Sequence, residues 1–145
     1  MLEGHDAVDT LLRRYFAEVA NVWPSRSAEE VPGELASPDV RFHPPNDVSG
    51  QAGLDRHKAF LNWHHNAFPD QHFAIVDVVV ADDRAACRWT LTGTHRGSFL
   101  GVEATGRHVE VNGIDFFHVS ADHIMEFWRS MDLRGLLKQL EAPGA

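Results

Sequence analysis

The residues best suited to chemistry lie between His108 and Asp132, in the stretch HVEVNGIDFFHVSADHIMEFWRSMD. This stretch predicts two strands joined by a tight turn at Ser120-Ala121-Asp122, and the side chains of a strand alternate between its two faces. A carboxylate and an imidazole among aromatic side chains can shift each other's pKa values and transfer protons. Polar residues at ordinary strand ends are the alternative interpretation. Asp132 shares its face with Ile124, Glu126, Trp128 and Ser130, and His118 shares its face with Ile114 and Phe116.

The opposite faces of the same two strands carry a second set of side chains. They are Asp115, Phe117 and Val119 on the first strand, and His123, Met125, Phe127, Arg129 and Met131 on the second. An internal salt bridge or a dimer contact explains Asp115 at least as well as catalysis does. Arg88, on an earlier predicted strand, would meet a substrate carboxylate, pair with an interior acid or lie on a solvated face.

Composition describes an ordinary globular protein and excludes some partners. The chain has 145 residues, of which 43% are hydrophobic, and a formal net charge of −8. Nucleic-acid binding draws on clustered Lys and Arg, which the sequence lacks, so no nucleic-acid partner is expected. No apolar run is long enough to cross a bilayer, and the amphipathic N-terminal stretch is unlike a signal peptide. We therefore expect no membrane partner and a cytoplasmic location, with the single Cys87 a buried apolar residue.

Hydrophobic periodicity predicts the elements that must position these residues. Ser37-Pro38-Asp39 is predicted to be a turn, and the glycine-rich residues 96–107 a long, mobile connection. Helices followed by a run of antiparallel strands indicate one α+β domain over residues 1–145, in which a curved mixed or antiparallel sheet wraps over N-terminal helices. The other predicted elements are helices at 6–20, 51–68 and 133–140, a short helix starting at Ser27, and strands at 40–43, 72–81 and 84–95.

A sheet of this kind leaves a concave, apolar mouth that suits a small ligand. Trp63 and Phe68, on the second long helix, are expected to line this mouth, although aromatic residues of a helix also serve as plain core. No metal site is expected. His64 and His65 are adjacent, and neighbours on a helix lie about 100° apart, which makes it difficult for both to hold one ion.

Short strings spread along the chain resemble one family when they are taken in order. They are Phe42-His43-Pro44, Ala67-Phe68-Pro69-Asp70, Thr92-Gly93-Thr94-His95-Arg96-Gly97, Phe99-Leu100-Gly101, Thr105-Gly106-Arg107, Gly113-Ile114-Asp115, Trp128 and Asp132-Leu133. Their order and spacing are similar to those of the SnoaL-like polyketide (ester) cyclases of the nuclear transport factor 2-like superfamily, over roughly residues 7–141. One fold hosts many chemistries, so the resemblance bears more on the fold than on the activity.

The resemblance implies a cone-shaped, cystatin-like α+β barrel with a deep pocket. Characterised members of the family close a ring on a polyketide methyl ester by intramolecular aldol condensation, without a metal or an organic cofactor. The family's acid/base carboxylate falls on Asp132, its pocket histidine on His118, and the histidine of its early His-Pro string on His43. We therefore expect these three residues to be catalytic and no cofactor to be needed.

An aldol closure needs a base for a proton next to a carbonyl group, and donors for the oxygens that become negative. A carboxylate with its free pKa of about 4 is a weak base, so burial would have to raise the pKa of Asp132. Trp128, Phe116 and Ile114 are expected to provide apolar surroundings and to contact the substrate. The alternative is that Asp132 caps the final helix, because Asp is a favoured N-cap residue.

We therefore expect an enzyme that performs cofactor-independent acid/base chemistry on a small hydrophobic or aromatic carbonyl compound, such as aldol cyclisation of a polyketide ester or a related proton transfer. The alternatives are a non-catalytic small-molecule-binding module, an isomerase or hydrolase relative, and a closed pocket whose sheet serves association only. A homodimer or tetramer is expected through the sheet, where Val76, Val78 and Val80 offer an apolar second face. The alternative is that this strand is packed in the core of the monomer. Segment 43–53 is rich in Pro and Gly and departs from the family pattern, so the identity of the substrate does not carry over.

Overall fold

The computed structural model describes residues 4–25, 32–45 and 51–141, and the helix start predicted at Ser27 lies outside them. From residue 54 onward the elements lie close to their predicted bounds, whereas residues 51–52, predicted to begin a helix, form a short strand. The helices are α1 (His5–Glu18), α3 (Pro32–Leu35), α4 (Leu54–Ala67) and α5 (Leu133–Glu141), with a 3-10 turn η1 at Ala20–Val22. The strands are β1 (Ala36–His43), β2 (Gln51–Ala52), β3 (His72–Ala81), β4 (Arg84–Thr94), β5 (His108–Ser120) and β6 (His123–Met131).

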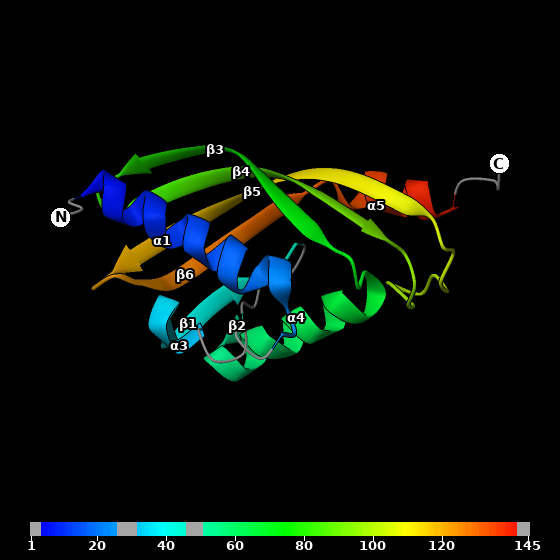
Figure 1. Ribbon diagram of the computed structural model, residues 1–145, viewed down its shortest axis with the longest axis horizontal. Helices are drawn as coiled ribbons and strands as arrows, with labels where there is room; N and C mark the ends of the chain where they lie inside the picture. The colour runs from blue at the N-terminus through cyan, green and yellow to red at the C-terminus, as the bar shows by residue number, and fades with distance from the viewer. Residues whose placement is uncertain (1–3, 26–31, 46–50, 142–145) are drawn as a thin grey trace.

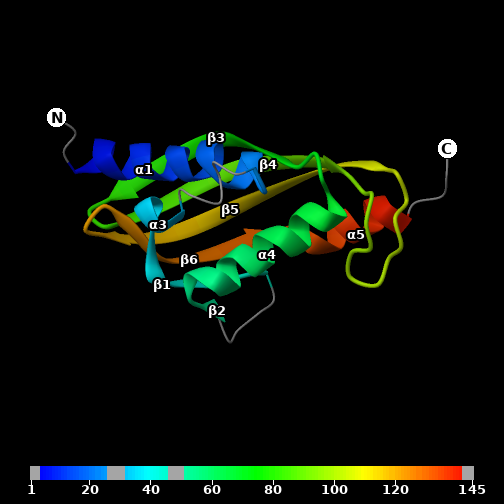
Figure 2. The same ribbon diagram turned by 60° about the horizontal axis from the view of Figure 1, so that its bottom comes forward.

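The strands form one mixed sheet in the order β2-β1-β6-β5-β4-β3 (Figures 1 and 2). β1 runs parallel to β6, and the other neighbouring pairs are antiparallel. The turn predicted between β5 and β6 is confirmed: Ala121 and Asp122 have positive φ values of 50° and 63°, as a type I′ hairpin turn requires. The predicted α+β class with a mixed sheet is therefore confirmed.

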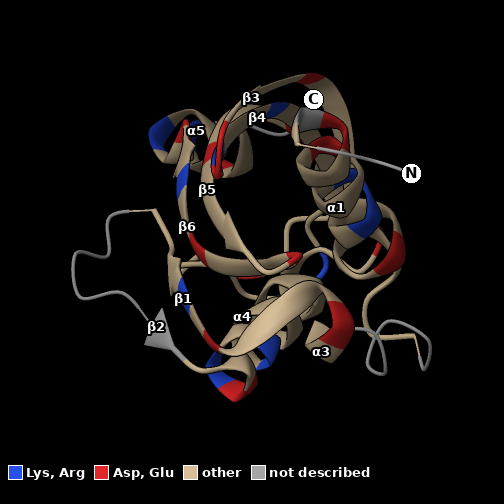
Figure 3. Ribbon diagram, turned by 90° about the vertical axis from the view of Figure 1, so that its left-hand side faces the viewer, with Lys and Arg blue, Asp and Glu red and all other residues tan. Residues whose placement is uncertain are grey.

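The sheet curls strongly, and α1, α3 and α4 lie on its concave side (Figure 3). It is not closed into the barrel that the resemblance implies, because β2 and β3 form its two edges. Residues of α1 and α4 join one buried apolar cluster with residues of the strands. Helices, rather than further strand pairing, therefore cover the inner face of the sheet.

The core lies on the inner face, and burial on β5 alternates residue by residue, as the predicted period of 2 requires. Phe117 of β5 and Phe127 of β6 are fully buried and stack with their ring centroids 5.1 Å apart. Tyr15 of α1 packs edge-on against Phe127. On the outer face, Phe116 and Ile114 remain 44% and 47% exposed.

Two predictions for the strands are wrong in detail. Ser37-Pro38-Asp39 belongs to β1 rather than to a turn. The short β2 pairs only with the far end of β1, so the start of β1 is an edge, where proline is tolerated. Ile124 is buried instead of sharing the face of Glu126, because a bulge shifts the β5–β6 register next to Val119.

The connection at 96–107, predicted to be long and mobile, is joined to the end of α4. The backbone N–H groups of Arg96 and Gly97 both donate to the carbonyl oxygen of Ala67, at 2.9 and 3.2 Å. A Cβ atom at Gly97 would lie 2.1 Å from the backbone oxygen of Asn66, so only glycine fits there. Further along the connection, the side chain of Phe99 is buried.

Candidate functional site

Most of the predicted site residues lie on the outer, convex face of the sheet, opposite the core. The backbone register places Phe116 opposite Trp128, Trp128 opposite His43, and Arg88 opposite Ile114. The structure thus brings these residues together, but not beneath the helices. The outer-face set is Asp132, His118, His43, Trp128, Phe116, Ile114 and Arg88.

Asp132 is exposed and caps α5. Its Oδ1 accepts a hydrogen bond from the backbone N–H of Gly135 at 2.9 Å, so the N-cap role considered for it is confirmed. Asp132 also lines a shallow hollow of about 270 Å³ with Arg88 and Ile114. Its catalytic role stays a prediction.

His43 and His118 each face a carboxylate on the outer face. His43 Nε2 lies 2.6 Å from Glu126 Oε2, and its ring stacks on Trp128 with centroids 5.0 Å apart. His118 Nε2 lies 3.2 Å from Asp83 Oδ2. The residues predicted to act together therefore have separate partners, and the catalytic roles of the two histidines also stay predictions.

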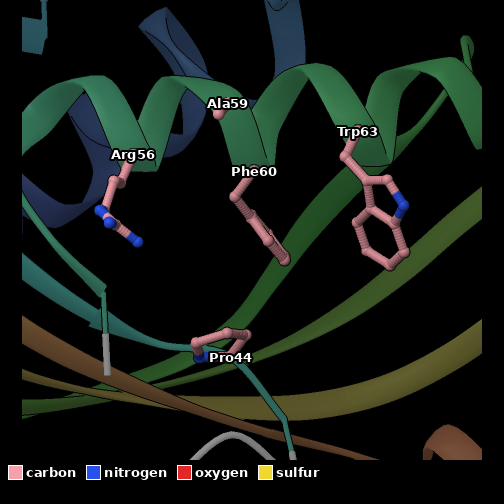
Figure 4. Close-up of a pocket in the computed structure, with 5 residues that line it drawn as sticks. All are labelled: Pro44, Arg56, Ala59, Phe60 and Trp63. Carbon is pink, nitrogen blue, oxygen red and sulfur yellow. The ribbon is translucent and has the colours of Figure 1, made fainter. Parts of the chain in front are cut away.

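Trp63 and Phe68 lie on the helix side of the sheet. Phe68 is 2% exposed and belongs to the core. Trp63 is 42% exposed and projects from α4 in the same direction as Arg56 and Phe60, toward Pro44 (Figure 4). These four residues, Trp63 among them, line a groove of about 430 Å³.

A smaller cavity adjoins this groove and shares Pro44, Phe60 and Trp63 with it. Its volume is about 80 Å³, and its lining is apolar except for Arg129 of β6 and His64 of α4. An apolar enclosure with a few converging polar groups is the usual form of a small-molecule site. The cavity between α4 and β6 is therefore the candidate functional site.

Arg129 reaches the cavity with its charge already paired. Its Nε and Nη2 donate to Oδ1 and Oδ2 of Asp115 at 2.9 and 2.8 Å, and the two side chains are 5% and 0% exposed. Burial by itself would lower the pKa of Arg129, but the charge and hydrogen bonds of Asp115 outweigh burial and raise this pKa. The internal salt bridge considered for Asp115 is therefore present, and Arg129 is charged at neutral pH.

Three aromatic rings surround the guanidinium of Arg129. Its central carbon lies 5.4 Å from the ring centroid of Phe42, 4.9 Å from that of Phe73 and 5.2 Å from that of Trp89. Cation–π attraction offsets part of the cost of burying the charge. A guanidinium has five N–H donors, and Asp115 takes only two bonds from them. Within the described residues, Nη1 has no hydrogen-bond partner and can donate to a ligand.

His64 faces the same cavity, and Gln71 holds its ring. Gln71 Nε2 donates to the backbone oxygen of Ala20 at 3.1 Å, and Gln71 Oε1 hydrogen-bonds to Nδ1 of His64. Burial lowers the pKa of His64 to about 4; the bond to Gln71 opposes this shift, and the charges of Arg129 and His65 add to it. His64 is therefore neutral at pH 7.

Tyr15 and His57 form another buried polar pair, which links α1 to α4. The hydroxyl of Tyr15 hydrogen-bonds to Nε2 of His57, and both side chains are buried in the core. Burial, helped by the charge of Arg129, lowers the pKa of His57 to about 3, and burial raises the pKa of Tyr15. Neither residue lines the cavity, so the pair serves to join the two helices.

The sequence prediction did not include Arg129 or His64 in the site. The alternation of strand residues placed Arg129 on the face of Phe127 and Met131, opposite Asp132, and the structure confirms that grouping. The missing information was which of the two faces the helices cover. For His64, the sequence placed either it or His65 on the apolar stripe of the helix, without deciding which of the two faces the core.

The part of the chain that the structure describes has neither a metal-binding cluster nor a membrane-spanning helix. In the ranges 4–25, 32–45 and 51–141, no group of three or more His, Cys, Asp or Glu side chains is arranged to hold a metal ion. The helices of these same ranges include none with the length and apolar character needed to cross a membrane.

A curved mixed sheet with helices on its concave side is the fold of the nuclear transport factor 2-like class of α+β proteins. The sequence profile of the family described as SnoaL-like polyketide cyclase matches residues 10–140. The chain therefore belongs to the SnoaL-like polyketide cyclase family. A search of curated proteins finds no significant match.

Solved structures share the fold over almost the whole chain. A candidate SnoaL-like polyketide cyclase from Jannaschia sp. CCS1 matches with a TM-score of 0.85 and 23% identity, over 97% of this chain and 95% of that one. TsrD from Streptomyces laurentii matches with a TM-score of 0.81 and 26% identity, over 99% and 100%. IdmH from Streptomyces antibioticus, a candidate polyketide cyclase, matches with a TM-score of 0.73 and 30% identity, over 95% and 100%.

Proposed function

We propose that the protein is an enzyme that performs cofactor-independent acid/base chemistry on a small hydrophobic or aromatic carbonyl compound. The reaction would be an intramolecular aldol cyclisation of a polyketide ester or a related proton transfer. Family membership supports this class of reaction. The observation that carries the proposal is the charged guanidinium of Arg129 in the wall of an apolar cavity.

Removal of a proton next to a carbonyl group places negative charge on the carbonyl oxygen. A donor that is already oriented in an apolar site stabilises this charge more strongly than water does. Nη1 of Arg129 is such a donor, and the two bonds to Asp115 hold the guanidinium in place. We therefore assign to Arg129 the binding of the reacting carbonyl oxygen, and to Asp115 the positioning of Arg129.

A ligand would occupy both the cavity and the groove, with its reacting end in the cavity. The cavity of about 80 Å³ has room for the reacting end of a molecule only, since one water takes up about 30 Å³ of the liquid. The adjoining groove of about 430 Å³ presents Phe60 and Trp63 to the remainder of the ligand (Figure 4). This division suits a hydrophobic or aromatic compound.

A catalytic centre on the outer face, built from Asp132, His118 and His43, is the competing proposal. The inner cavity is favoured because its polar groups converge inside an apolar enclosure. On the outer face, Asp132 accepts a backbone hydrogen bond, and the two histidines face different carboxylates.

The test compares two arginines on opposite sides of the sheet in the turnover of aryl β-keto esters. Arg129→Met combined with Asp115→Leu removes the guanidinium without leaving a lone buried carboxylate, and should lower kcat/KM by about 100-fold or more. Arg88→Met, on the outer face, should change kcat/KM by less than about threefold. The reverse result, with activity lost in Arg88→Met and kept in the double variant, would contradict the proposal.

A non-catalytic small-molecule-binding module is the second candidate function, and the paired charge of Arg129 favours it. A guanidinium already neutralised by Asp115 can hold a carbonyl group without activating it. Isothermal titration calorimetry with the same esters separates the two functions. Binding without turnover would favour the module, and turnover would exclude it.

We further propose that two copies of the chain associate through the outer face of the sheet. One row of side chains crosses the sheet there, each opposite the next in register, and two of its apolar members, Val79 and Phe116, are 63% and 44% exposed. A contiguous apolar row on an exposed face is typical of an interface. The apolar row consists of Val79, Ala86, Phe116 and Trp128, and the polar His43 lies at its end.

The apolar face predicted from Val76, Val78 and Val80 differs from this row. Val76 is exposed, but Val78 and Val80 are partly buried against the core, because a bulge shifts the register of β3 after Ile75. Sedimentation velocity tests the association. The wild-type chain should sediment as a dimer, and Phe116→Glu as a monomer, whereas Lys138→Glu on α5 should leave the dimer intact. A wild-type monomer would contradict the proposal.

A further inference from the structure

The polar lining of the candidate cavity comes from two opposite elements. Arg129 enters from β6 and His64 from α4. The ring of Phe73 lies near both, with its centroid 4.9 Å from the guanidinium carbon and 6.4 Å from the centroid of His64. Arg129 and His64 therefore line the same small cavity on either side of Phe73, where one ligand can contact both.

Hydrogen bonds fix which nitrogen of His64 carries the proton. Because Gln71 Nε2 donates to the backbone oxygen of Ala20, its other amide atom, Oε1, is the one that meets Nδ1 of His64. An amide oxygen only accepts, so Nδ1 must carry the hydrogen, and in a neutral imidazole Nε2 is then the unprotonated nitrogen. Within the described residues, Nε2 has no hydrogen-bond partner.

We propose that Nε2 of His64 is the proton acceptor of the reaction, with Gln71 as its positioning residue; this inference rests on the proposed function. The C–H bond next to the carbonyl group bound by Arg129 breaks, and its proton forms an N–H bond at Nε2. The electron pair of the C–H bond becomes the enolate double bond, and the carbonyl π electrons move to the oxygen beside Arg129. In an aldol closure, the enolate carbon attacks a second carbonyl group, and the resulting alkoxide takes the proton back from Nε2.

The other titratable groups near the cavity are bonded to other residues or do not line the cavity. Asp115 receives two bonds from Arg129. Tyr15 and His57 are bonded to each other in the core and do not line the cavity. The His65 side chain does not line it either. His64 is thus the neutral group of the cavity lining that has a free lone pair.

The surroundings of His64 also affect its strength as a base. Burial, together with the charges of Arg129 and His65, holds the pKa of His64 at about 4, so Nε2 is a weak base in the empty cavity. A β-keto ester, in which one carbon is flanked by two carbonyl groups, has an acidic proton and is therefore the substrate chosen for the test. Once the enolate forms, its negative charge next to Arg129 favours the imidazolium form of His64.

The test follows one proton transfer rather than the whole reaction. Ethyl benzoylacetate, an aryl β-keto ester, is incubated with the protein in deuterated buffer, and NMR measures exchange of its acidic methylene protons. His64→Phe should lower the protein-catalysed exchange rate at least about 100-fold with less than a threefold change in Kd. His65→Phe, the matched control on the next residue, should keep both values near those of the wild type.

A second readout requires no change to the cavity. Nitrogen-15 chemical shifts of His64 in the wild-type protein should show a protonated Nδ1 and an unprotonated Nε2, and Gln71→Leu should abolish this preference and slow exchange. The opposite tautomer in the wild type, or undiminished exchange in His64→Phe, would overturn the assignment of His64. If the wild-type protein binds the ester and catalyses no exchange, the proposed function fails as well, and the two failures are thereby distinguished.

Discussion

Arg129 of β6 and Asp115 of β5 face each other on the inner side of the sheet and form a two-point ion pair, at 2.9 and 2.8 Å, in the core of the protein. Taking each charge out of water costs several kcal/mol, and the attraction of the pair returns this only when the geometry is good. Breaking the pair on one side should therefore cost much more than replacing both partners.

Arg129→Met alone leaves the carboxylate of Asp115 buried and unpaired, and should lower the free energy of unfolding by about 3–5 kcal/mol. Arg129→Met with Asp115→Leu should recover most of this loss, because no lone charge remains. Urea denaturation followed by tryptophan fluorescence measures both values. Equal stabilities of the single and double variants would contradict the described burial of the pair.

The neutral buried histidines predict a loss of stability in mild acid. Burial lowers the pKa of His57 to about 3 and that of His64 to about 4, whereas both titrate near 6.5 in the unfolded chain. Between these values the unfolded state binds more protons, so the free energy of unfolding falls as the pH falls. The contribution is complete above pH 6.5, and about 2 kcal/mol per histidine should be lost by pH 5.

Urea denaturation at several pH values between about 7.5 and 5 measures this loss. His57→Phe removes one of the two titrating groups and should roughly halve the dependence of the free energy of unfolding on pH, whatever its effect at pH 7.5. A variant that keeps the full wild-type dependence would show that His57 is not a source of the acid sensitivity.

Asp132 offers a way to separate capping from catalysis. Asp132→Ala removes the acceptor for the Gly135 N–H and should lower the free energy of unfolding by about 1 kcal/mol, whereas Asp132→Asn keeps a capping oxygen and should cost little. With the site in the inner cavity, both variants should keep their turnover of β-keto esters. A stable Asp132→Asn variant without activity would establish the base role implied by the resemblance.

Gly113 of β5 makes room for a buried tryptophan. A Cβ atom there would lie 2.4 Å from Cη2 of Trp89 and 2.9 Å from the backbone oxygen of Ser130. Gly113→Ala should therefore lower the free energy of unfolding by about 1–3 kcal/mol through overpacking. Gly33→Ala, on α3 with no atom within 4 Å of the new methyl group, is the matched control and should change it by less than about 0.5 kcal/mol. Similar losses in both variants would argue against close packing at Gly113.

The fold could be predicted largely from local patterns. Strands β3 and β4 have hydrophobic residues in strand-like runs, and the period of 2 on β5 and β6 correctly grouped Asp115 with Phe117 and Phe127 with Arg129. Details that depend on how the strands pair could not be predicted from these local patterns. The bulge next to Val119 and the edge position of Ser37 depend on the pairing of strands. The sequence of a single segment does not contain this information.

The site could not be predicted to the same extent, because both faces of β5 and β6 carry aromatic residues. Phe116 and Trp128 on one face look as suited to a pocket as Phe117 and Phe127 on the other, and only the placement of α1 and α4 decides which face is enclosed. In a strand whose residues alternate between two faces, an arginine also suggests a side chain exposed to solvent. Its burial becomes evident only when Asp115 is found opposite it.

The attachment of the 96–107 connection to α4 has a consequence for the choice of ligand. Phe99 and His64 line the same cavity, and the bonds from Arg96 and Gly97 to Ala67 tie the backbone that carries one to the helix that carries the other. These backbone hydrogen bonds therefore hold the two walls of the cavity together. If this cavity is the proposed site, we expect it to accept a flat aryl ring and to exclude a branched substituent of the same hydrophobicity.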